Sequence, residues 1–387
     1  MSTPTPTSRR NTSQPHHPLR IALDASRTTV ARVTGTEQYA LRLLQSLITL
    51  NETEPYHHHL TLYFRDTPPP DLFPPSNDVT HRVIPQHRLW THARFARAIW
   101  ADRPDVTFVP AHTLPLIFPG RAVVTVHDLG FKVFPKAHPT RQRLYLDLTT
   151  RFSAARASLV LADSTATAHD LTDFYGTPPD KIRVVYPGVE ITPPDAANIG
   201  DDIARVRQKY VLPERYFLFI GTLQPRKNIA RMVQAFDRFR RSSREDIGFV
   251  LAGKQGWLYD PAWTDGVEGL HLTGYIDDAD KPALYAGAVA LLFVTLYEGF
   301  GFPVVEAMRC GTPVIASRTS SLPELVGDAG LLVDPEDVDA IAAAMSRLAT
   351  DADLRETLRE RGYRQAQQFN WSQAAQQTLE ALITAAS

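Results

Sequence analysis

The chain has 387 residues, more than one ordinary hydrophobic core accommodates, so two domains are expected. Hydrophobic residues make up 43% of the chain and charged residues 21%, a composition typical of globular proteins. The single cysteine, Cys310, excludes an internal disulfide bond. No apolar run approaches the roughly 20 residues that span a bilayer, and the net charge of −1 gives no reason to expect a nucleic-acid partner.

Residues 1–18 are rich in Pro, Ser and Thr and lack the apolar stretch of a secretory signal. This composition predicts a disordered tail outside the fold. The lone cysteine and the missing signal together favour a cytoplasmic location.

Positive charge is concentrated in one part of the chain. Residues 81–156 hold 12 Lys and Arg against four acids. Such a surface can attract phosphates or the anionic inner face of a membrane, which leaves peripheral membrane association open. The alternative is a solvated surface whose charges pair with acids elsewhere in the chain.

Short apolar runs alternate with helical patterns from residue 20 onward. Buried strands are predicted at residues 20–24, 60–64, 106–109, 122–126, 158–162 and 182–186. Helices are predicted between them at residues 37–50, 88–101, 140–155 and 165–174. The alternation implies βαβ units and a parallel sheet.

The alternation of strands and helices stops around residues 192–214, which are rich in Pro, Ala and Asp and include a short charged helix. It then resumes. Further strands are predicted at residues 216–220, 249–252, 271–273, 289–295 and 313–317. Helices are predicted at residues 229–240, 281–287 and 303–309, and from 335 to the end. Two α/β domains therefore follow one another, with a boundary near residues 190–212. Ligands of such sheets bind beyond the carboxyl ends of the strands.

The strongest motif is EGFGFPVVE at residues 298–306, directly after a predicted strand. Gly299 and Gly301 let the backbone turn sharply and approach a ligand closely, and Pro303 suits the first turn of a helix. Glu306, placed in that first turn, can accept hydrogen bonds from two vicinal hydroxyls such as those of a ribose. A glycine–proline turn before a helical glutamate also occurs without any ligand.

The start of this predicted helix offers an anion site. The backbone N–H groups expected to be free are those of Phe302, Val304 and Val305. Together with the helix dipole they favour a bound phosphate.

The longer segment EGFGFPVVEAM resembles the donor-site signature of retaining glycosyltransferases of family 4, and the resemblance covers most of residues 20–385. It implies the GT-B fold, in which two Rossmann-like doubly wound α/β domains face each other across a cleft. Glu306 would then bind the nucleotide ribose, and Glu298 would lie near the transferred sugar and support developing charge. The donor-binding residues that the resemblance implies in this segment are Gly299, Phe300, Gly301, Phe302 and Glu306.

The resemblance also divides the chain. Residues 19–200 would form the acceptor domain and residues 201–370 the nucleotide-sugar domain. The C-terminal helix, residues 371–387, would cross back onto the first domain.

A second motif, GTLQPRKN, occupies residues 221–228 between a strand and a helix. Arg226 and Lys227 place two cations near a helix N-terminus, which is unfavourable unless an anion such as a diphosphate binds there. The family often has an arginine directly after the glycine, where this chain has Thr222, so Arg226 is the candidate to supply that charge. The Pro-Arg-Lys-Asn variant resembles members that act on O-antigen and other polysaccharide chains, often with GDP-mannose.

Two segments of the first half resemble further parts of the family site. Gly35, in GTEQY, resembles the glycine loop that closes over the donor, although a helix boundary explains this glycine equally well. His127 ends the strand segment VVTVHD and could bond a sugar hydroxyl or steady charge at the anomeric carbon. A hydrogen-bonded core histidine is the alternative.

Strand ends in the second half supply the remaining candidates. By resemblance, the backbone at Tyr275 and Ile276 reads the nucleotide base, and Lys254 lies near the donor. Lys254 could equally be a solvated loop residue. Ser164 is most simply a helix N-cap, and Glu324 is expected to be structural.

Two patterns point to other functions. Asp277-Asp-Ala-Asp280 contains an Asp-x-Asp, a metal motif of a different glycosyltransferase fold, but it precedes a helix that aspartate commonly caps. No metal site and no cofactor are therefore expected. The helix 88–101 mixes Trp and Phe with Arg and could press on a membrane. Packing against the sheet is favoured over that reading.

The sequence thus predicts a retaining hexosyltransferase whose partners are a nucleotide-diphosphate sugar, with GDP-mannose favoured, and a saccharide or lipid-linked saccharide acceptor. The catalytic candidates are Glu298, His127, Arg226 and Lys227. Transfer of glucose or N-acetylglucosamine from a UDP- or ADP-sugar stays open. A non-catalytic nucleotide-sugar-binding subunit of the same fold also stays open.

Overall fold

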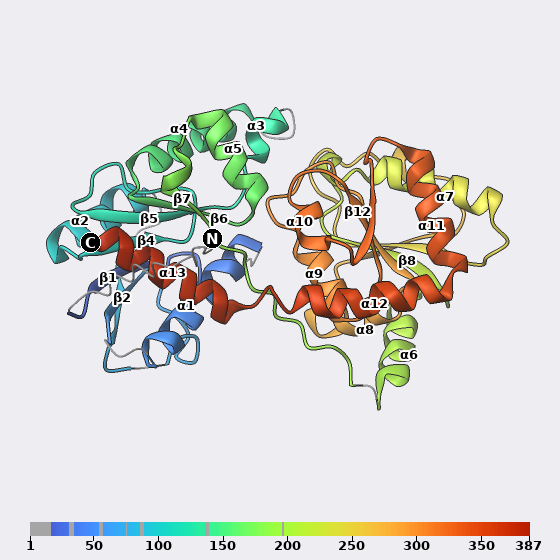
Figure 1. The fold of residues 1–387 in the computed structure, drawn as a ribbon, viewed down its shortest axis with the longest axis horizontal. Helices are drawn as coiled ribbons and strands as arrows, with labels where there is room; N and C mark the ends of the chain where they lie inside the picture. The colour runs from blue at the N-terminus through green and yellow to red at the C-terminus, as the bar shows by residue number, and fades with distance from the viewer. Residues whose placement is uncertain are drawn as a thin grey trace, which may run out of the picture.

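The computed structural model describes residues 17–30, 35–53, 57–74, 76–85, 89–135, 139–195 and 197–387 (Figure 1). The predicted tail, residues 1–18, lies outside the described residues except for its last two positions. Two halves, each built on one parallel sheet, lie side by side.

The first half contains a seven-stranded parallel sheet in the order β3-β2-β1-β4-β5-β6-β7. Its strands are β1 Arg20–Asp24, β2 His59–Phe64, β3 Val79–Val83, β4 Val106–Val109, β5 Arg121–Val126, β6 Leu159–Ala162 and β7 Ile182–Val184. Its helices are α1 Gly35–Asn51, the π-helix η1 Trp90–Phe95, α2 Ala96–Asp102, α3 Gly130–Val133, α4 Thr140–Arg156 and α5 Thr165–Tyr175.

The second half contains a six-stranded parallel sheet in the order β10-β9-β8-β11-β12-β13. Its strands are β8 Tyr216–Ile220, β9 Gly248–Ala252, β10 Leu270–Gly274, β11 Ala290–Phe293, β12 Val314–Ser317 and β13 Gly330–Val333. Its helices are α6 Ile199–Tyr210, α7 Ile229–Ser242, α8 Lys281–Ala286, α9 Phe302–Arg309, α10 Leu322–Val326, α11 Val338–Thr350 and α12 Ala352–Ala366, with the 3₁₀ turns η4 Pro225–Lys227 and η6 Asp278–Asp280.

Both sheets are doubly wound, which confirms the predicted fold class. The strand order reverses between β1 and β4 in the first sheet and between β8 and β11 in the second. Loops that leave the carboxyl ends of such a pair diverge and leave room for a ligand. In the second sheet these are the loops that carry GTLQPRKN and EGFGFPVVE.

The last helix, α13 Trp371–Ala386, packs on the first sheet (Figure 1). Its apolar residues, including Leu379 and Leu382, belong to the same core cluster as Leu43 of α1 and Leu23 of β1. Asn370 caps the helix through a hydrogen bond from the backbone N–H of Gln373. The chain therefore passes between the two halves twice.

The strands β3 and β13 and the short helices α3 and α10 were not predicted. Both strands lie at sheet edges. In β3 the polar residues Thr80, His81 and Arg82 interrupt the apolar pattern, as exposure at an edge allows. The predicted helix 88–101 is a π-helical turn followed by α2, and its first residue lies outside the described residues. Trp90 and Phe95 are buried and stacked with ring centroids 5.0 Å apart, so these two aromatics pack inward. Within the described residues, no helix has both the length and the apolar character to cross a bilayer.

Candidate active site at the facing strand ends

The loops after β8 and β9 touch through their backbones. Gly221 and Gly253 have positive φ values of 146° and 142°. A Cβ on Gly253 would lie 2.0 Å from the carbonyl oxygen of Gly221, so no larger residue fits. Thr222 faces the same loop, because a Cβ on Gly256 would lie 2.6 Å from its Cγ2. This contact sets the course of the chain into η4.

Asn228 fastens η4 to the loop after β11. It adopts the left-handed conformation with φ 59°, which asparagine tolerates better than most residues. Its buried side-chain amide donates to the carbonyl oxygens of Val294 at 3.0 Å and Pro335 at 2.7 Å. The backbone N–H of Leu296 donates to the carbonyl of Arg226 at 3.0 Å. The two motifs that the sequence singles out are therefore neighbours.

Glu298 bridges the two predicted phosphate-binding cations. Its carboxylate accepts a hydrogen bond from Lys227 Nζ at 2.6 Å and lies 3.4 Å from Arg226 Nη1. The three side chains are only 9%, 13% and 18% exposed, for Glu298, Lys227 and Arg226 respectively. The backbone N–H of Glu298 donates to Ser320 Oγ at 2.8 Å, which holds the residue in place.

Charge dominates the ionisation of this group. Burial alone would raise the pKa of Glu298, but the positive charges of Lys227 and Arg226 outweigh it and lower the pKa below its usual range. Burial lowers the pKa of Lys227 despite the attraction of Glu298. Glu298 is therefore an anion at neutral pH and is not a protonated general acid.

The glycine turn before α9 is sterically required. Gly301 has φ 130°, and a Cβ there would lie 2.7 Å from Leu322 Cδ2. One part of the predicted anion site is wrong, because the N–H of Val304 already donates to the carbonyl of Gly301 at 3.0 Å.

Glu306 lies one turn further into α9 than predicted, since the first turn holds no acid. It is half-buried, and its Oε2 accepts a hydrogen bond from Tyr285 at 2.7 Å. Burial raises the pKa of Glu306, opposed by the positive charge of Lys281. Lys281 was not predicted as a site residue, although it directly follows Asp280, which was predicted to cap the helix.

Tyr275 and Ile276 follow β10, and Lys254 follows β9. Tyr275 is 67% exposed, whereas Ile276 is buried in the core. Lys254 is exposed. Burial lowers the pKa of Lys281, but the hydrogen bond to Asp278 and the negative charge of Glu306 outweigh it and the pKa is raised. Lys281 thus lies near Glu306, whereas no described contact joins Lys254 to Glu298.

The two halves touch at the carboxyl ends of their strands. A Cβ on Gly299 would lie 2.1 Å from the carbonyl oxygen of His127, and a Cβ on Gly35 would lie 3.8 Å from the ring of Phe302. The predicted residues from both halves are thereby brought together. Phe300 packs in the second core and turns its ring edge toward Phe302, with centroids 5.1 Å apart.

Tyr297 reaches from the second half into the first. Its hydroxyl donates to Asp170 Oδ2 at 2.6 Å and accepts from the N–H of Leu129 at 3.1 Å. Arg226 Nη1 also donates to the carbonyl of Tyr297 at 2.5 Å. Tyr297 was not predicted as a site residue, and the signal that pointed to it is its position directly before Glu298.

His127 is held by the first half through both ring nitrogens. Nδ1 lies 2.7 Å from Asp163 Oδ2 and Nε2 lies 3.3 Å from the carbonyl oxygen of Pro110. Both partners are acceptors, so each nitrogen donates in the imidazolium form. Burial lowers the pKa of His127, but the negative charge of Asp163 outweighs it and the pKa is raised. A bond from His127 to a sugar requires release of the Pro110 contact.

The Asp-x-Asp segment takes part in an ion-pair network rather than in helix capping. Asp280 is 3% exposed and accepts from Arg205 at 2.7 Å, Lys209 at 2.6 Å and Tyr210 at 2.8 Å. Asp277 accepts from Lys209 at 2.6 Å. The predicted caps are wrong in detail, since neither aspartate side chain bonds the helix backbone. Asp277 and Asp280 thus pair with the cations Arg205 and Lys209 of α6.

Comparisons with known proteins give matches to both halves of the chain. The family model described as Glycosyl transferases group 1 matches residues 201–365, and that described as Glycosyltransferase Family 4 matches residues 33–192. The chain is 33% identical over 370 residues to the O-antigen chain mannosyltransferase B of Escherichia coli, which covers 90% of this chain and 96% of the relative.

Solved structures show the same fold. Sucrose-phosphate synthase from Thermosynechococcus elongatus superposes with a TM-score of 0.71 at 23% identity, covering 96% of this chain and all of that chain. The Anabaena protein HepE in complex with UDP-glucose superposes with a TM-score of 0.68 at 17% identity. The superposition covers 95% of this chain and all of the HepE chain. The GT-B architecture expected from the sequence is thus confirmed.

Proposed function

The chain belongs to the family 4 glycosyltransferases, and we propose that it transfers mannose from GDP-mannose to a hydroxyl of a saccharide or lipid-linked saccharide, with retention of configuration. The mannosyl donor is supported by the name of the Escherichia coli relative and by the Pro-Arg-Lys-Asn segment at residues 225–228.

The observation that carries the proposal is the buried group of Arg226, Lys227 and Glu298 at the point where the strand order reverses. The two cations share the carboxylate of Glu298 and also lie in the field of the buried carboxylate of Asp128 in the first half. A diphosphate that enters beside Lys227 would take over the pairing that these carboxylates now supply. Glu306 with its Tyr285 partner would hold the ribose hydroxyls.

These residues also suit the chemical step. Cleavage of the bond between the sugar C1 and the phosphate oxygen leaves the bonding electrons, and hence negative charge, on the diphosphate. Arg226, Lys227 and the N-terminus of α9 would stabilise that charge in the transition state. The acceptor oxygen would bond to C1 on the same face and pass its proton to the leaving phosphate. Attack from that face gives retention.

We further propose that these cations do the work that a divalent metal does in other glycosyltransferases. Once Lys227 turns toward phosphate, Glu298 would be released to bond the sugar hydroxyls and support positive charge at C1. Glu298 would then act as an electrostatic partner, and no covalent intermediate on a glutamate is invoked.

A donor panel tests this function. Purified protein is incubated with GDP-mannose, UDP-glucose, UDP-N-acetylglucosamine or ADP-glucose, with and without EDTA, and donor hydrolysis and transfer are measured. We expect turnover of GDP-mannose that EDTA leaves unchanged, and an α-linked product by NMR. Preference for a UDP- or ADP-sugar would refute the mannosyl assignment, and binding without turnover of any donor would indicate a non-catalytic subunit.

A further inference from the structure

Helix α4 reverses the usual pattern of a surface helix. Its buried residues are small or polar, namely Thr149, Thr150, Ser153 and Ala154. Its exposed residues include large apolar ones, namely Leu144, Tyr145 and Leu148, at 58%, 51% and 59% exposed. A surface helix normally packs its apolar stripe inward, so this exposed stripe calls for an explanation.

The buried face of α4 is well packed, so the helix is not simply misplaced. Ser153 Oγ accepts a hydrogen bond from the backbone N–H of Leu114 at 2.9 Å. Thr149 Oγ1 donates to the carbonyl of Tyr145 at 2.8 Å within the helix. Rotation of the helix to bury its leucines would break the bond between Leu114 and Ser153, whereas the bond of Thr149 lies within the helix.

Positive charge accompanies the apolar stripe. Arg141 and Arg151 are exposed on the same side of α4 as Leu144 and Leu148, because residues three, four and seven apart share a helix face. The one acid of the helix, Asp147, is already neutralised, since Lys132 lies 3.0 Å away and Tyr175 donates to it at 2.8 Å. The exposed side of α4 therefore carries cations and apolar groups together.

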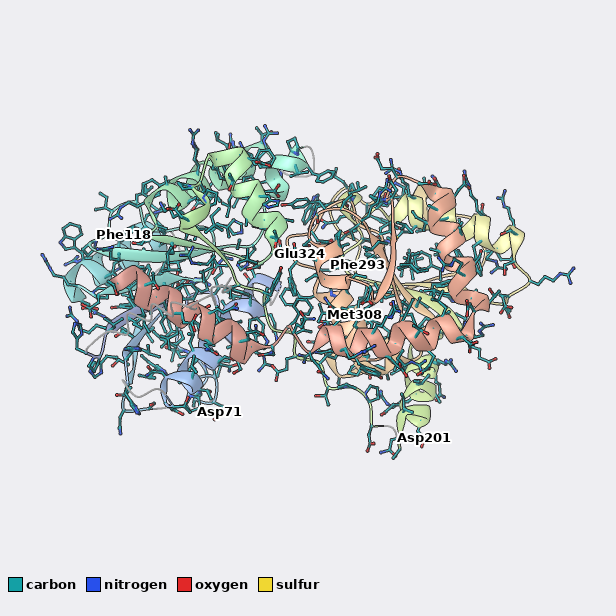
Figure 2. All side chains as sticks on the ribbon, viewed as in Figure 1. Asp71, Phe118, Asp201, Phe293, Met308 and Glu324 are labelled. Atoms are coloured by element: carbon teal, nitrogen blue, oxygen red, sulfur yellow. The ribbon has the colours of Figure 1, made fainter. Side chains whose placement is uncertain are left out.

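A neighbouring loop extends this surface. The guanidinium of Arg156, at the end of α4, lies 4.4 Å from the ring centroid of Phe118 (labelled in Figure 2). Beside Phe118, Ile117 is 70% exposed and Leu116 is 55% exposed. We call the combined surface of Ile117, Arg141, Leu144, Tyr145, Leu148 and Arg151 the α4 face.

We propose that the α4 face docks on an anionic lipid bilayer. Arg141 and Arg151 flank Leu144 and Leu148 along one stripe, and the one acid of the helix is paired with Lys132. That mixture is characteristic of helices that lie in a membrane interface, where apolar groups enter the acyl boundary and arginines reach the phosphates. Helix α4 lies on the outer side of the first half, away from the second half, so docking leaves the site between the sheets free (Figure 1).

Vesicle sedimentation of the full chain tests this proposal. The probes are vesicles of phosphatidylcholine alone and of phosphatidylcholine mixed with phosphatidylglycerol, each at low and high salt. We expect binding to the anionic vesicles only, weakened by salt. The double variant Leu144→Ser, Leu148→Ser and the double variant Arg141→Glu, Arg151→Glu should each lower the partition coefficient at least about tenfold.

Matched controls come from the other half. Leu258 is 60% exposed and Arg364 is exposed on α12, far from α4 in Figure 1. Leu258→Ser and Arg364→Glu should bind anionic vesicles like the unaltered chain. Donor hydrolysis in solution and thermal unfolding should be unchanged in all four variants, which shows that the α4 variants fold.

Three results would overturn the proposal. The first is equal binding of the α4 variants and the unaltered chain to anionic vesicles. The second is equal binding of the unaltered chain to neutral and anionic vesicles. The third is a dimer in light scattering that Leu144→Ser, Leu148→Ser converts to a monomer, which would make the α4 face an interface between two copies of the chain.

Discussion

The ammonium of Lys227 lies 2.6 Å from the carboxylate of Glu298, and the two residues stand on loops that leave the central strands of the second sheet. The predicted phosphate ligand is thus already paired with the predicted sugar-side residue. In the proposed reaction the diphosphate must displace this internal anion, so Glu298 both competes with the donor and is released by it.

Glu298→Gln removes the competing charge while keeping the shape of the side chain. We expect inorganic pyrophosphate and the nucleoside diphosphate to bind about tenfold more tightly, because less negative charge then opposes the cations Lys227 and Arg226. Transfer should fall at least about a hundredfold, since charge at C1 loses its partner. Calorimetry and steady-state rates measure the two effects, and weaker pyrophosphate binding would show that Glu298 does not compete.

Lys227→Ala tests the phosphate clamp, by which we mean the two proposed phosphate-binding cations Arg226 and Lys227. We expect transfer to be abolished, because the leaving diphosphate loses its buried cation. Folding should persist, because Arg226 still faces Glu298, at a stability cost of about 1–3 kcal/mol. Arg238→Ala on α7 is the control, since Arg238 forms an exposed ion pair with Asp339 of α11. Full activity of Lys227→Ala would refute the clamp.

The sheets could be predicted because buried parallel strands are apolar on both faces and therefore stand out as short runs. The edge strand β3 could not, because exposure removes that constraint and admits the polar residues Thr80, His81 and Arg82. Within the site, Gly301 and Arg226 were predicted from motifs that also determine the local backbone. The pairing of Glu298 with Lys227 could not be predicted, because it depends on how two loops distant in sequence approach each other. The same holds for Tyr297, whose partners lie in the other half.

The buried pair of His127 and Asp163 predicts a pH dependence of stability. The pKa of His127 is raised in the folded chain above its ordinary value of 6.5. The stabilisation of the fold by protonated His127 is therefore complete below about pH 6.5. It is lost as the pH rises through the pKa of His127 in the folded chain. The stability difference between the unaltered chain and Asp163→Asn should be larger at about pH 6 than at about pH 9, by on the order of 1 kcal/mol. Urea unfolding at both pH values measures it, and a pH-independent difference would contradict an imidazolium.

Glu324 caps a helix of the opposite half, which goes beyond the structural role that the sequence suggested. Its carboxylate accepts from the backbone N–H groups of Thr165 at 2.9 Å and Ala166 at 3.1 Å, and from the hydroxyl of Tyr186 at 2.6 Å. Figure 2 shows it at the junction of the two halves. A carboxylate at a helix N-terminus contributes about 0.5–2 kcal/mol.

Glu324→Ala should therefore favour separation of the halves. We expect a larger radius of gyration in small-angle scattering and a higher KM for the donor, with each half still folded. Glu336→Ala, at an exposed surface pair, is the control. An unchanged radius and KM would mean that other contacts alone hold the halves together.

Gly299→Ala probes the tightest contact between the halves. The added Cβ would lie 2.1 Å from the carbonyl oxygen of His127 and 2.7 Å from Asp128 Cβ, so backbone must move on one side. Because Glu298 is the neighbouring residue, we expect transfer to fall at least about a hundredfold, as displacements near 1 Å can do. Gly200→Ala is the matched control, since a Cβ there meets nothing within 4 Å and Gly200 lies in helix α6. That variant should keep full activity and gain up to about 1 kcal/mol of stability, because alanine is the better helix former. If Gly299→Ala were as active as Gly200→Ala, catalysis would not need this contact. The arrangement in which Gly299 touches the His127 carbonyl would then not be the catalytic one.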